Sequence, residues 1–302
     1  PGFQNLLERG IRWATNGDLA KVPAFSDQTL MTELPKNLKP FDYVEADVPF
    51  YPANKQWGKM GENIRKMQKP LDPKEGQKHY ITPEGFELKL FASEPDLEGK
   101  PIAMNWDERG RLWVALTIDY PNELQPSGQG RDKIVICEDT DGDNVADKFT
   151  TFADKLSIPT SLIFANGGVI VHQAPDTLFL KDINGDGIAD ERKVLFTGWS
   201  TGDTHAGPSN LNYGLDNWIY GMVGYAGFAG TVGDEKQSFR TGFYRMKPDG
   251  SKIEFLRNTN NNSWGVGLSE EGILFGSTAN GNPSVHLPIP NRYYEKVRGW
   301  SS

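Results

Sequence analysis

Apolar residues recur at helical spacing near the start of the chain. They run from Phe3 to Ala14, and Asn16-Gly17 follows as a typical helix stop. This pattern predicts a short helix within residues 1–20. The chain starts at Pro1 rather than Met, so we expect a piece of a longer protein whose signals were lost.

Residues 21–80 show no sustained periodicity. Frequent prolines interrupt any long element. We therefore interpret this stretch as a linker or an arm, with a short helix at most around Gly61–Gln68. The pattern then changes, because the apolar residues of Phe86–Leu90 alternate with charged ones as in a half-buried strand.

One pattern repeats four times in the remainder of the chain. Each copy is a strand, a polar turn that usually carries Gly, and a second apolar strand. The copies are Ile102–Val114, Ser161–Val171, Asn210–Tyr220 and Trp264–Phe275. Their turns lie 49 to 58 residues apart, slightly more than the roughly 40–50 residues of a β-propeller blade. A solenoid is the main alternative, but hairpins and long variable loops favour a propeller with loop insertions.

We therefore predict an all-β protein, with a β-propeller over residues 81–302 after a short N-terminal helix and an irregular linker. This length fits about four to five blades. A propeller must close on itself to remove its edge strands. If the full ring has more blades, this chain holds an open arc.

The composition agrees with short strands and many turns. Gly supplies 33 and Pro 20 of the 302 residues, and 37% of residues are hydrophobic, which suits an all-β protein better than a helical bundle. No apolar run is long enough for a transmembrane helix, so we expect no membrane insertion. The net charge is −8 and no basic cluster stands out, so a nucleic-acid partner is not expected.

Cys137 is the only cysteine of the chain. A single cysteine excludes an intrachain disulfide, a Cys-rich zinc site and a CxxCH haem site within these residues. Cys137 ends the apolar run Ile134-Val135-Ile136 beside an acidic loop. We therefore expect a small buried side chain whose thiol pKa is raised.

A repeated acidic loop is the strongest chemical pattern. Ca²⁺ requires oxygen ligands, as at positions 1, 3, 5 and 9 of a loop with a backbone carbonyl at position 7. The two copies offer Asp139, Asp141, Asp143, Val145 and Asp147, and Asp182, Asn184, Asp186, Ile188 and Asp190. Position 6 requires a sharp turn and holds Asn144 or Gly187, which both accept a left-handed backbone. Because position 12 lacks the bidentate Glu of an EF-hand, we expect weak, structural calcium binding. Solvated turns are the alternative.

Among the four histidines, His205 has the most distinctive setting. It lies in the Gly-rich loop of residues 201–207, directly before a predicted inner strand. In a propeller such loops gather at one end of the central channel. A neutral imidazole there can accept a proton from an alcohol, and Asp203 is close enough in sequence to orient it. His205 and Asp203 are therefore the candidate catalytic residues, with a structural or exposed histidine as the commoner alternative.

Several motifs resemble one known family. They are Pro83–Glu87, Asn105–Val114, Gly202–Ser209, Ile289–Tyr294 and the two acidic loops. Together they resemble the propeller domain of the membrane-bound dehydrogenases of planctomycete-type bacteria, whose relatives carry a haem-binding CxxCH domain downstream. Residues 1–13 resemble the last helix of a trehalose-utilisation (ThuA-like) domain, which can precede such propellers.

This family is in turn similar to the soluble quinoprotein glucose and sorbosone dehydrogenases. Those proteins are six-bladed propellers that bind pyrroloquinoline quinone and Ca²⁺. The resemblance implies that His205 is a general base while a hydride passes to the quinone, and that Arg257 and Asn258 contact this cofactor. The two acidic loops are not equated with the calcium that contacts the quinone.

We therefore expect a dehydrogenase that oxidises a sugar or polyol alcohol. The resemblance places it in the periplasm, the cell envelope or outside the cell, with electrons passing to a haem c domain of the same parent chain. The first alternative is a calcium-stabilised propeller that binds polysaccharide or protein without redox chemistry. A scaffold for neighbouring catalytic domains is a further alternative.

The side chains at the channel mouth distinguish these hypotheses. Convergence of His205, Asp203 and basic side chains favours the dehydrogenase. Exposed aromatic side chains at the same place, such as Tyr120, Tyr225 or Tyr293, favour the binding module.

Overall fold

The computed structural model describes residues 31–48, 64–121, 124–260, 262–279, 284–287, 289–293 and 297–298. The chain divides into two units, Pro1–Phe91 and Ala92–Ser302. The helix predicted within residues 1–20 lies outside the described residues. Among the described helices, none is both long and apolar enough to cross a membrane.

The first unit contains a small sheet and a short helix. Strand β1 (Tyr43–Val48) pairs antiparallel with β2 (Ile64–Gln68), and α2 (Pro73–Gln77) follows. The carboxylate of Asp72 accepts a hydrogen bond from the backbone N–H of Lys74 at 2.9 Å. This bond caps the helix, because the first N–H groups of a helix have no partner within it.

Two predictions for this unit are wrong. The segment around Gly61–Gln68 is not a helix where it is described, because β2 bonds to β1 instead, and so short a helix has little stability of its own. The alternating stretch Phe86–Leu90 forms no strand. Two of its carbonyls accept hydrogen bonds from the side chains of Thr82 and Gln77 rather than from a neighbouring strand.

The second unit is a β-propeller of four blades, each an antiparallel sheet. A short helix, α3 (Glu94–Leu97), precedes the first blade. The strands of the first two blades are β3 (Lys100–Trp106), β4 (Leu112–Thr117), β5 (Asp132–Glu138) and β6 (Lys148–Leu156), then β7 (Ser161–Ala165), β8 (Gly168–Gln173), β9 (Asp176–Lys181) and β10 (Glu191–Thr197).

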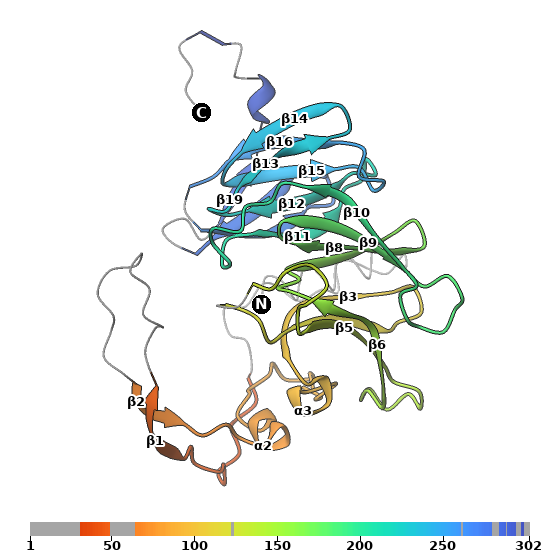
Figure 1. The fold of residues 1–302 in the computed structure, drawn as a ribbon. Helices are drawn as coiled ribbons and strands as arrows, with labels where there is room; N and C mark the ends of the chain where they lie inside the picture. The colour runs from red at the N-terminus through yellow and green to blue at the C-terminus, as the bar shows by residue number, and fades with distance from the viewer. Residues whose placement is uncertain are drawn as a thin grey trace, which may run out of the picture. The chain divides into compact units, whose positions relative to one another are not determined.

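The third blade has four strands, and the fourth has three in the described part. These strands are β11 (Pro208–Tyr213), β12 (Ile219–Val223), β15 (Gly242–Met246) and β16 (Ile253–Asn258), then β17 (Ser263–Leu268), β18 (Leu274–Thr278) and β19 (Val285–Leu287). A hairpin of β13 (Phe228–Val232) and β14 (Glu235–Phe239) is inserted between β12 and β15, which is one of the insertions that the repeat spacing predicted. In Figure 1 the colour follows this order, from yellow β3 to blue β19.

The predicted hairpins and the predicted fold class are confirmed. Each repeat forms the first two strands of one blade. Left-handed residues make the turns, with φ of 76° at Gly110, 59° at Asn217 and 77° at Gly272, a conformation that Gly and Asn adopt most readily. The first strands lie side by side across the blades, β3 next to β7, β7 next to β11 and β11 next to β17.

Large aromatic side chains fill the space between the second and third blades. Trp199 is only 1% exposed. Its ring meets that of Phe228 edge-on at 4.8 Å and lies 4.9 Å from that of Tyr244, while Phe239 stacks on Phe228. Such rings bury much apolar surface in well-defined orientations, so this cluster fixes how the two blades meet.

A buried polar network crosses the same junction. His172, in β8 of the second blade, is within hydrogen-bond distance of Tyr244 in the third, with Nε2 and Oη 2.7 Å apart. Its Nδ1 lies 2.9 Å from Oγ1 of Thr177, which also accepts the indole N–H of Trp199. Burial lowers the pKa of His172 to about 3 and raises that of Tyr244 well above its usual value. Both groups are therefore neutral, and the network buries no net charge.

This network predicts a loss of stability in acid. The folded state keeps His172 neutral, whereas the unfolded chain protonates it below a pKa of about 6.5. Stability is therefore complete above pH 6.5 and falls as the pH drops towards 3. Between pH 7 and pH 5 the wild-type chain should lose about 2 kcal/mol more than His172→Gln. Urea unfolding of both chains measures this difference, and parallel pH profiles would contradict it.

Candidate functional site

Alternating strand direction gives the propeller two ends with different connections. Turns between the first and second strands, and between the third and fourth, lie at one end, which we call the turn end. Connections between the second and third strands, and from blade to blade, lie at the other, which we call the loop end. Both acidic loops join a third strand to a fourth, whereas His205 lies between two blades. The acidic loops and His205 are therefore at opposite ends.

Hydrogen bonds fix the loops of the loop end to one another. The hydroxyl of Thr204 donates to the carbonyl of Pro121 at 2.6 Å, which joins the His205 loop to the long β4–β5 connection. The ammonium of Lys100 donates to the carbonyl of Tyr120 at 2.7 Å. Lys100 and the β4–β5 connection therefore belong to the same loop-end network as the His205 loop.

The His205 side chain is positioned by Asp203. The backbone N–H of His205 donates to Oδ1 of Asp203 at 2.8 Å, and the same oxygen lies 3.5 Å from His205 Nδ1. The imidazole side chain is 49% exposed and the carboxylate 19%. Nδ1 thus faces the carboxylate, and Nε2 is the nitrogen left for a ligand.

Aromatic residues divide between the two ends. The Tyr120 ring meets that of His205 edge-on at 5.2 Å, and Tyr225 follows β12 at the loop end. Tyr293 lies in the 3₁₀ helix η3 (Asn291–Tyr293). Its neighbour Arg292 is 3.7 Å from Glu254, near the start of β16, and this places Tyr293 at the turn end.

A buried carboxylate supports the loop end, and the sequence patterns did not identify it. Asp132 is 1% exposed. One of its oxygens accepts bonds from the Thr117 hydroxyl and the Ile158 N–H at 2.7 and 2.6 Å, and the other from the N–H groups of Ile118 and Asp119 at 2.6 and 3.0 Å. Four bonds compensate the charge of a buried carboxylate and hold two connections in place.

Arg257 and Asn258 lie at the loop-end terminus of β16. This is the outermost strand of the third blade, and neither residue lines the central cavity. Their contact with a cofactor stays a prediction, because they share the loop end with His205 but do not line the cavity, whereas His205 and Asp203 do lie together.

A cavity of about 310 Å³ lies among the four innermost strands. Its polar lining comes from Asn105, Thr160, Ser161, Asn210 and Asn212, and Trp264 adds an aromatic surface. Within the part of the chain that the structure describes, no charged side chain lines this cavity. The sequence analysis missed these residues, although amides at successive outward positions of a predicted strand, as in Asn210-Leu211-Asn212, are an available signal.

The two acidic loops have the same internal geometry. The carboxylate at position 1 accepts bonds from the N–H groups at positions 4 and 6, at 2.7 and 2.8 Å for Asp139 and at 2.6 and 2.8 Å for Asp182. Position 6 is left-handed in both, with φ of 67° at Asn144 and 88° at Gly187, as predicted.

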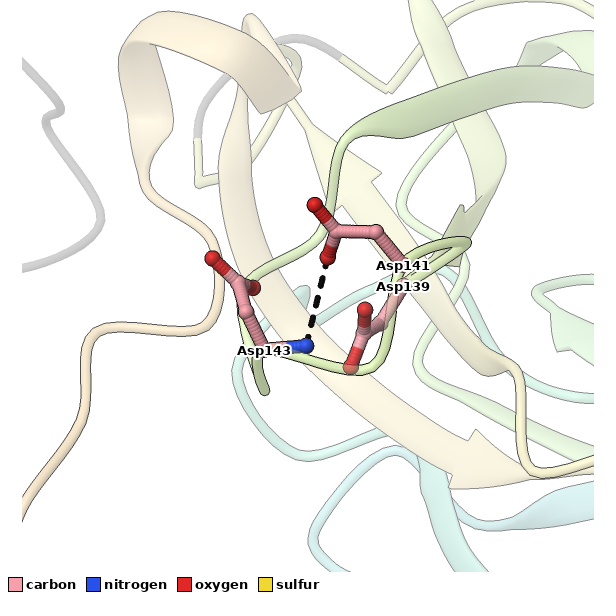
Figure 2. A group of neighbouring side chains, drawn as sticks. All are labelled: Asp139, Asp141 and Asp143. Atoms are coloured by element: carbon pink, nitrogen blue, oxygen red, sulfur yellow. Dashed lines mark hydrogen bonds between the residues drawn. The ribbon is translucent and has the colours of Figure 1, made fainter.

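In the first loop three carboxylates gather around one point. Asp139, Asp141 and Asp143 each place an oxygen within 4.8 Å of the others, and Figure 2 shows these side chains around the turn. Burial tends to raise the pKa of Asp139, but N–H bonds led by that of Asn144 lower it overall. The N–H of Gly187 leads the bonds that lower the pKa of Asp182. Carboxylates that stay ionised suit a hard cation.

A family model describes most of the chain. The model of a domain of unknown function, DUF7133, matches residues 72–301. The chain belongs to this family. A search of the curated proteins finds none that matches the DUF7133 chain.

Several solved structures are similar to part of the chain at low sequence identity. A Thermus thermophilus oxidoreductase described as a glucose dehydrogenase is 13% identical, with 63% of this chain and 62% of that one covered and a TM-score of 0.44. A chain of a nidogen/laminin complex is 15% identical, with 70% of this chain and 66% of that one covered and a TM-score of 0.45. The PQQ domain of a Coprinopsis cinerea pyranose dehydrogenase is 13% identical, with 61% of this chain and 47% of that one covered and a TM-score of 0.38. The DUF7133 chain spans 47% to 66% of such structures, and its own blades establish the propeller.

The prediction of a buried Cys137 with a raised thiol pKa is confirmed. Cys137 is buried in β5, and burial raises the pKa of its thiol to about 11. A thiol of this kind is protonated at neutral pH and is a poor nucleophile.

We expect the acidic loops of the DUF7133 propeller to bind calcium weakly. Without a bidentate Glu, the dissociation constant should be about 10⁻⁴–10⁻³ M, and calcium at ten times that value should stabilise the fold by about 1.4 kcal/mol for each loop that binds it. Asp139→Asn combined with Asp182→Asn should abolish this gain. Asp249→Asn, in another turn-end turn, is the matched control. Thermal unfolding with calcium or chelator tests the prediction, and equal curves for wild type would contradict it.

Proposed function

We propose that the DUF7133 propeller is an oxidoreductase domain that acts on the alcohol group of a sugar or polyol. The observation that carries this proposal is the half-exposed imidazole of His205 at the loop end, with Nδ1 beside the carboxylate of Asp203 and Nε2 left for a substrate. A positioned imidazole is the group that most often accepts a proton from a reacting hydroxyl at neutral pH.

In this proposal His205 Nε2 takes the hydroxyl proton as the carbonyl forms. The Asp203 carboxylate stabilises the imidazolium and holds its orientation. The carbon-bound hydrogen leaves with its electron pair as a hydride. Because no side chain accepts a hydride, the reaction requires a redox cofactor or another two-electron acceptor.

The described residues do not fit pyrroloquinoline quinone as that acceptor. The space beside Asp203 and Thr204 measures about 20 Å³, which is enough for roughly one water molecule. The central cavity is larger, but none of its lining residues is charged. A tricarboxylate there would find no counter-charge among these lining residues. A bound quinone would therefore need cationic residues that lie outside this lining.

A binding module without redox chemistry is the second candidate. The observation that favours it is the neutral cavity, where three Asn side chains and Trp264 offer hydrogen bonds and an apolar surface. Exposed Tyr225, and Tyr120 beside His205, extend this surface at the loop end. The acidic loops at the turn end would then stabilise the fold by binding calcium.

The proposal extends to partners and location. The substrate is a sugar or polyol, and a haem domain of the same parent protein is the proposed electron partner. A periplasmic, envelope or secreted location is proposed with them. The support for these points is the family resemblance of the motifs around His205 and of the acidic loops.

Oxidation of polyols with an artificial two-electron acceptor tests the proposal. His205→Gln should lower kcat by about 10²–10⁴-fold, the usual contribution of a general base. Asp203→Asn should lower kcat by a smaller factor, because it leaves the imidazole in place. The control is His286→Gln, which changes an exposed histidine of the fourth blade and should retain full activity.

The assay is run with and without added quinone and calcium on the intact chain and on its parent protein. Absence of oxidation under all these conditions, with sugar binding still measurable, would replace the oxidoreductase by the binding module. Equal activity of wild type and His205→Gln would remove the assigned role of His205.

A further inference from the structure

The innermost strands are irregular where they line the central cavity. In β3 the register moves from Pro101 opposite Leu116 to Ala103 opposite Ala115, so Ile102 is an extra residue. In β11 and β17 two residues likewise face one partner position, namely Asn210-Leu211 and Trp264-Gly265. Bulges of this kind re-aim side chains and are frequent beside functional sites. Three of the four strands around the cavity have one.

The bulge in β11 holds an unusual backbone conformation. Asn210 has φ of 58° in the middle of a strand, where left-handed residues are rare. Such conformations persist only where the surroundings stabilise them, and they cluster at binding sites. The N–H of Leu211 donates to Oγ of Ser161 in the next blade at 2.9 Å. This bond holds the bulge in place while Asn210 lines the cavity.

Two amides around the cavity have fixed orientations. Nδ2 of Asn212 donates to the carbonyls of Asn210 and Val266, both at 3.1 Å, so its Oδ1 remains as an acceptor. Oδ1 of Asn105 accepts the N–H of Trp106 at 2.9 Å, so its Nδ2 remains as a donor. The cavity thus offers both donors and acceptors, which is what ligand hydroxyl groups require because each of them donates and accepts.

The lining also limits the charge of the ligand. None of the described residues around the cavity carries a charge, so the lining offers an ionised ligand no counter-charge, whereas a neutral ligand needs none. Trp264 adds a broad apolar ring surface, and the volume of about 310 Å³ is at the lower end of ligand pockets. We propose that this cavity binds one neutral, polyhydroxylated ring, such as a single unit of a sugar or a cyclic polyol.

The inference deepens the proposed function and rests on it only for the role of the sugar as substrate. Thr160 lines both this cavity and the small space beside Asp203, so the two sites are neighbours. The binding itself requires neither His205 nor a redox step. Binding and oxidation can therefore fail separately.

Calorimetric titration of the intact chain with three matched sugars tests the proposal. D-glucose is neutral, D-glucuronate is its anionic counterpart and D-glucosamine is its cationic counterpart. Wild type should bind glucose at least about tenfold more tightly than either charged sugar. Trp264→Ala should weaken glucose binding by about tenfold, because the apolar contact surface is lost.

Asn105→Asp is the sharper variant. The new carboxylate can still accept the hydrogen bond from the N–H of Trp106, so the strand should fold. The Nδ2 donor of the amide, however, is replaced by a negatively charged oxygen. Glucosamine should then bind more tightly than glucose, and glucuronate should not bind. Asn217→Asp is the matched control, since Asn217 lies in a turn at the turn end, and it should leave the wild-type order of affinities unchanged.

His205→Gln separates this inference from the proposed function. Glucose binding that persists in His205→Gln and changes in Asn105→Asp supports the cavity, whether or not any sugar is oxidised. Glucose binding that is lost in His205→Gln and unaltered by both cavity variants would overturn the cavity site while supporting the His205 site. Absence of glucose binding, or equal affinity of wild type for glucose and glucuronate, would also overturn the proposal.

Discussion

Burial of both faces of the second and third blades is the constraint on which the propeller depends. Successive side chains of a strand point to opposite faces, and β8 shows the consequence. Ile170 packs into the apolar cluster between the second and third blades, whereas Val169 and Val171 pack into the cluster with the first blade. A strand covered on both sides requires a continuous apolar run rather than alternation. Each blade therefore needs its neighbours, and the His172–Tyr244 contact adds a directional bond to this packing.

The antiparallel order within each blade then separates the chemistry into two ends. Connections at the turn end are rich in Asp, Asn and Gly, because their turns require left-handed residues and side chains that bond to the backbone. Connections at the loop end range from the tight β8–β9 turn to the long β4–β5 connection, and side chains such as Asp132 and Thr204 hold them. A cation bound to the acidic loops would therefore act on stability, while the His205–Asp203 pair is available for chemistry without competing for it.

Local patterns were predictable from the sequence, and contacts between blades were not. The four hairpins, the left-handed position 6 of the acidic loops and the proximity of Asp203 to His205 all depend on residues close together in the chain. The contact of Lys100 with Tyr120 and the cavity between Asn105 and Asn212 depend on the assembly of blades. Strand β2 was mistaken for a helix because its pairing with β1, about twenty residues away, leaves no local pattern. The bulges were also not predictable from local patterns, although a single extra residue changes which side chains face the channel.

The channel and the loop end differ in charge, and this difference determines which ligand groups each of them can accommodate. In the channel, the polar groups of the described lining are amides and hydroxyls, so an ionised ligand finds no counter-charge there. At the loop end, Lys100 and Asp203 provide charge close to solvent in the same network as the exposed imidazole of His205, and an ionic intermediate costs less to form there. A neutral polyol can meet both conditions if its ring lies in the channel and one hydroxyl reaches the loop end. In the reaction proposed above, charge then develops only at the hydroxyl that His205 would deprotonate, and the rest of the ligand stays neutral beside the neutral lining.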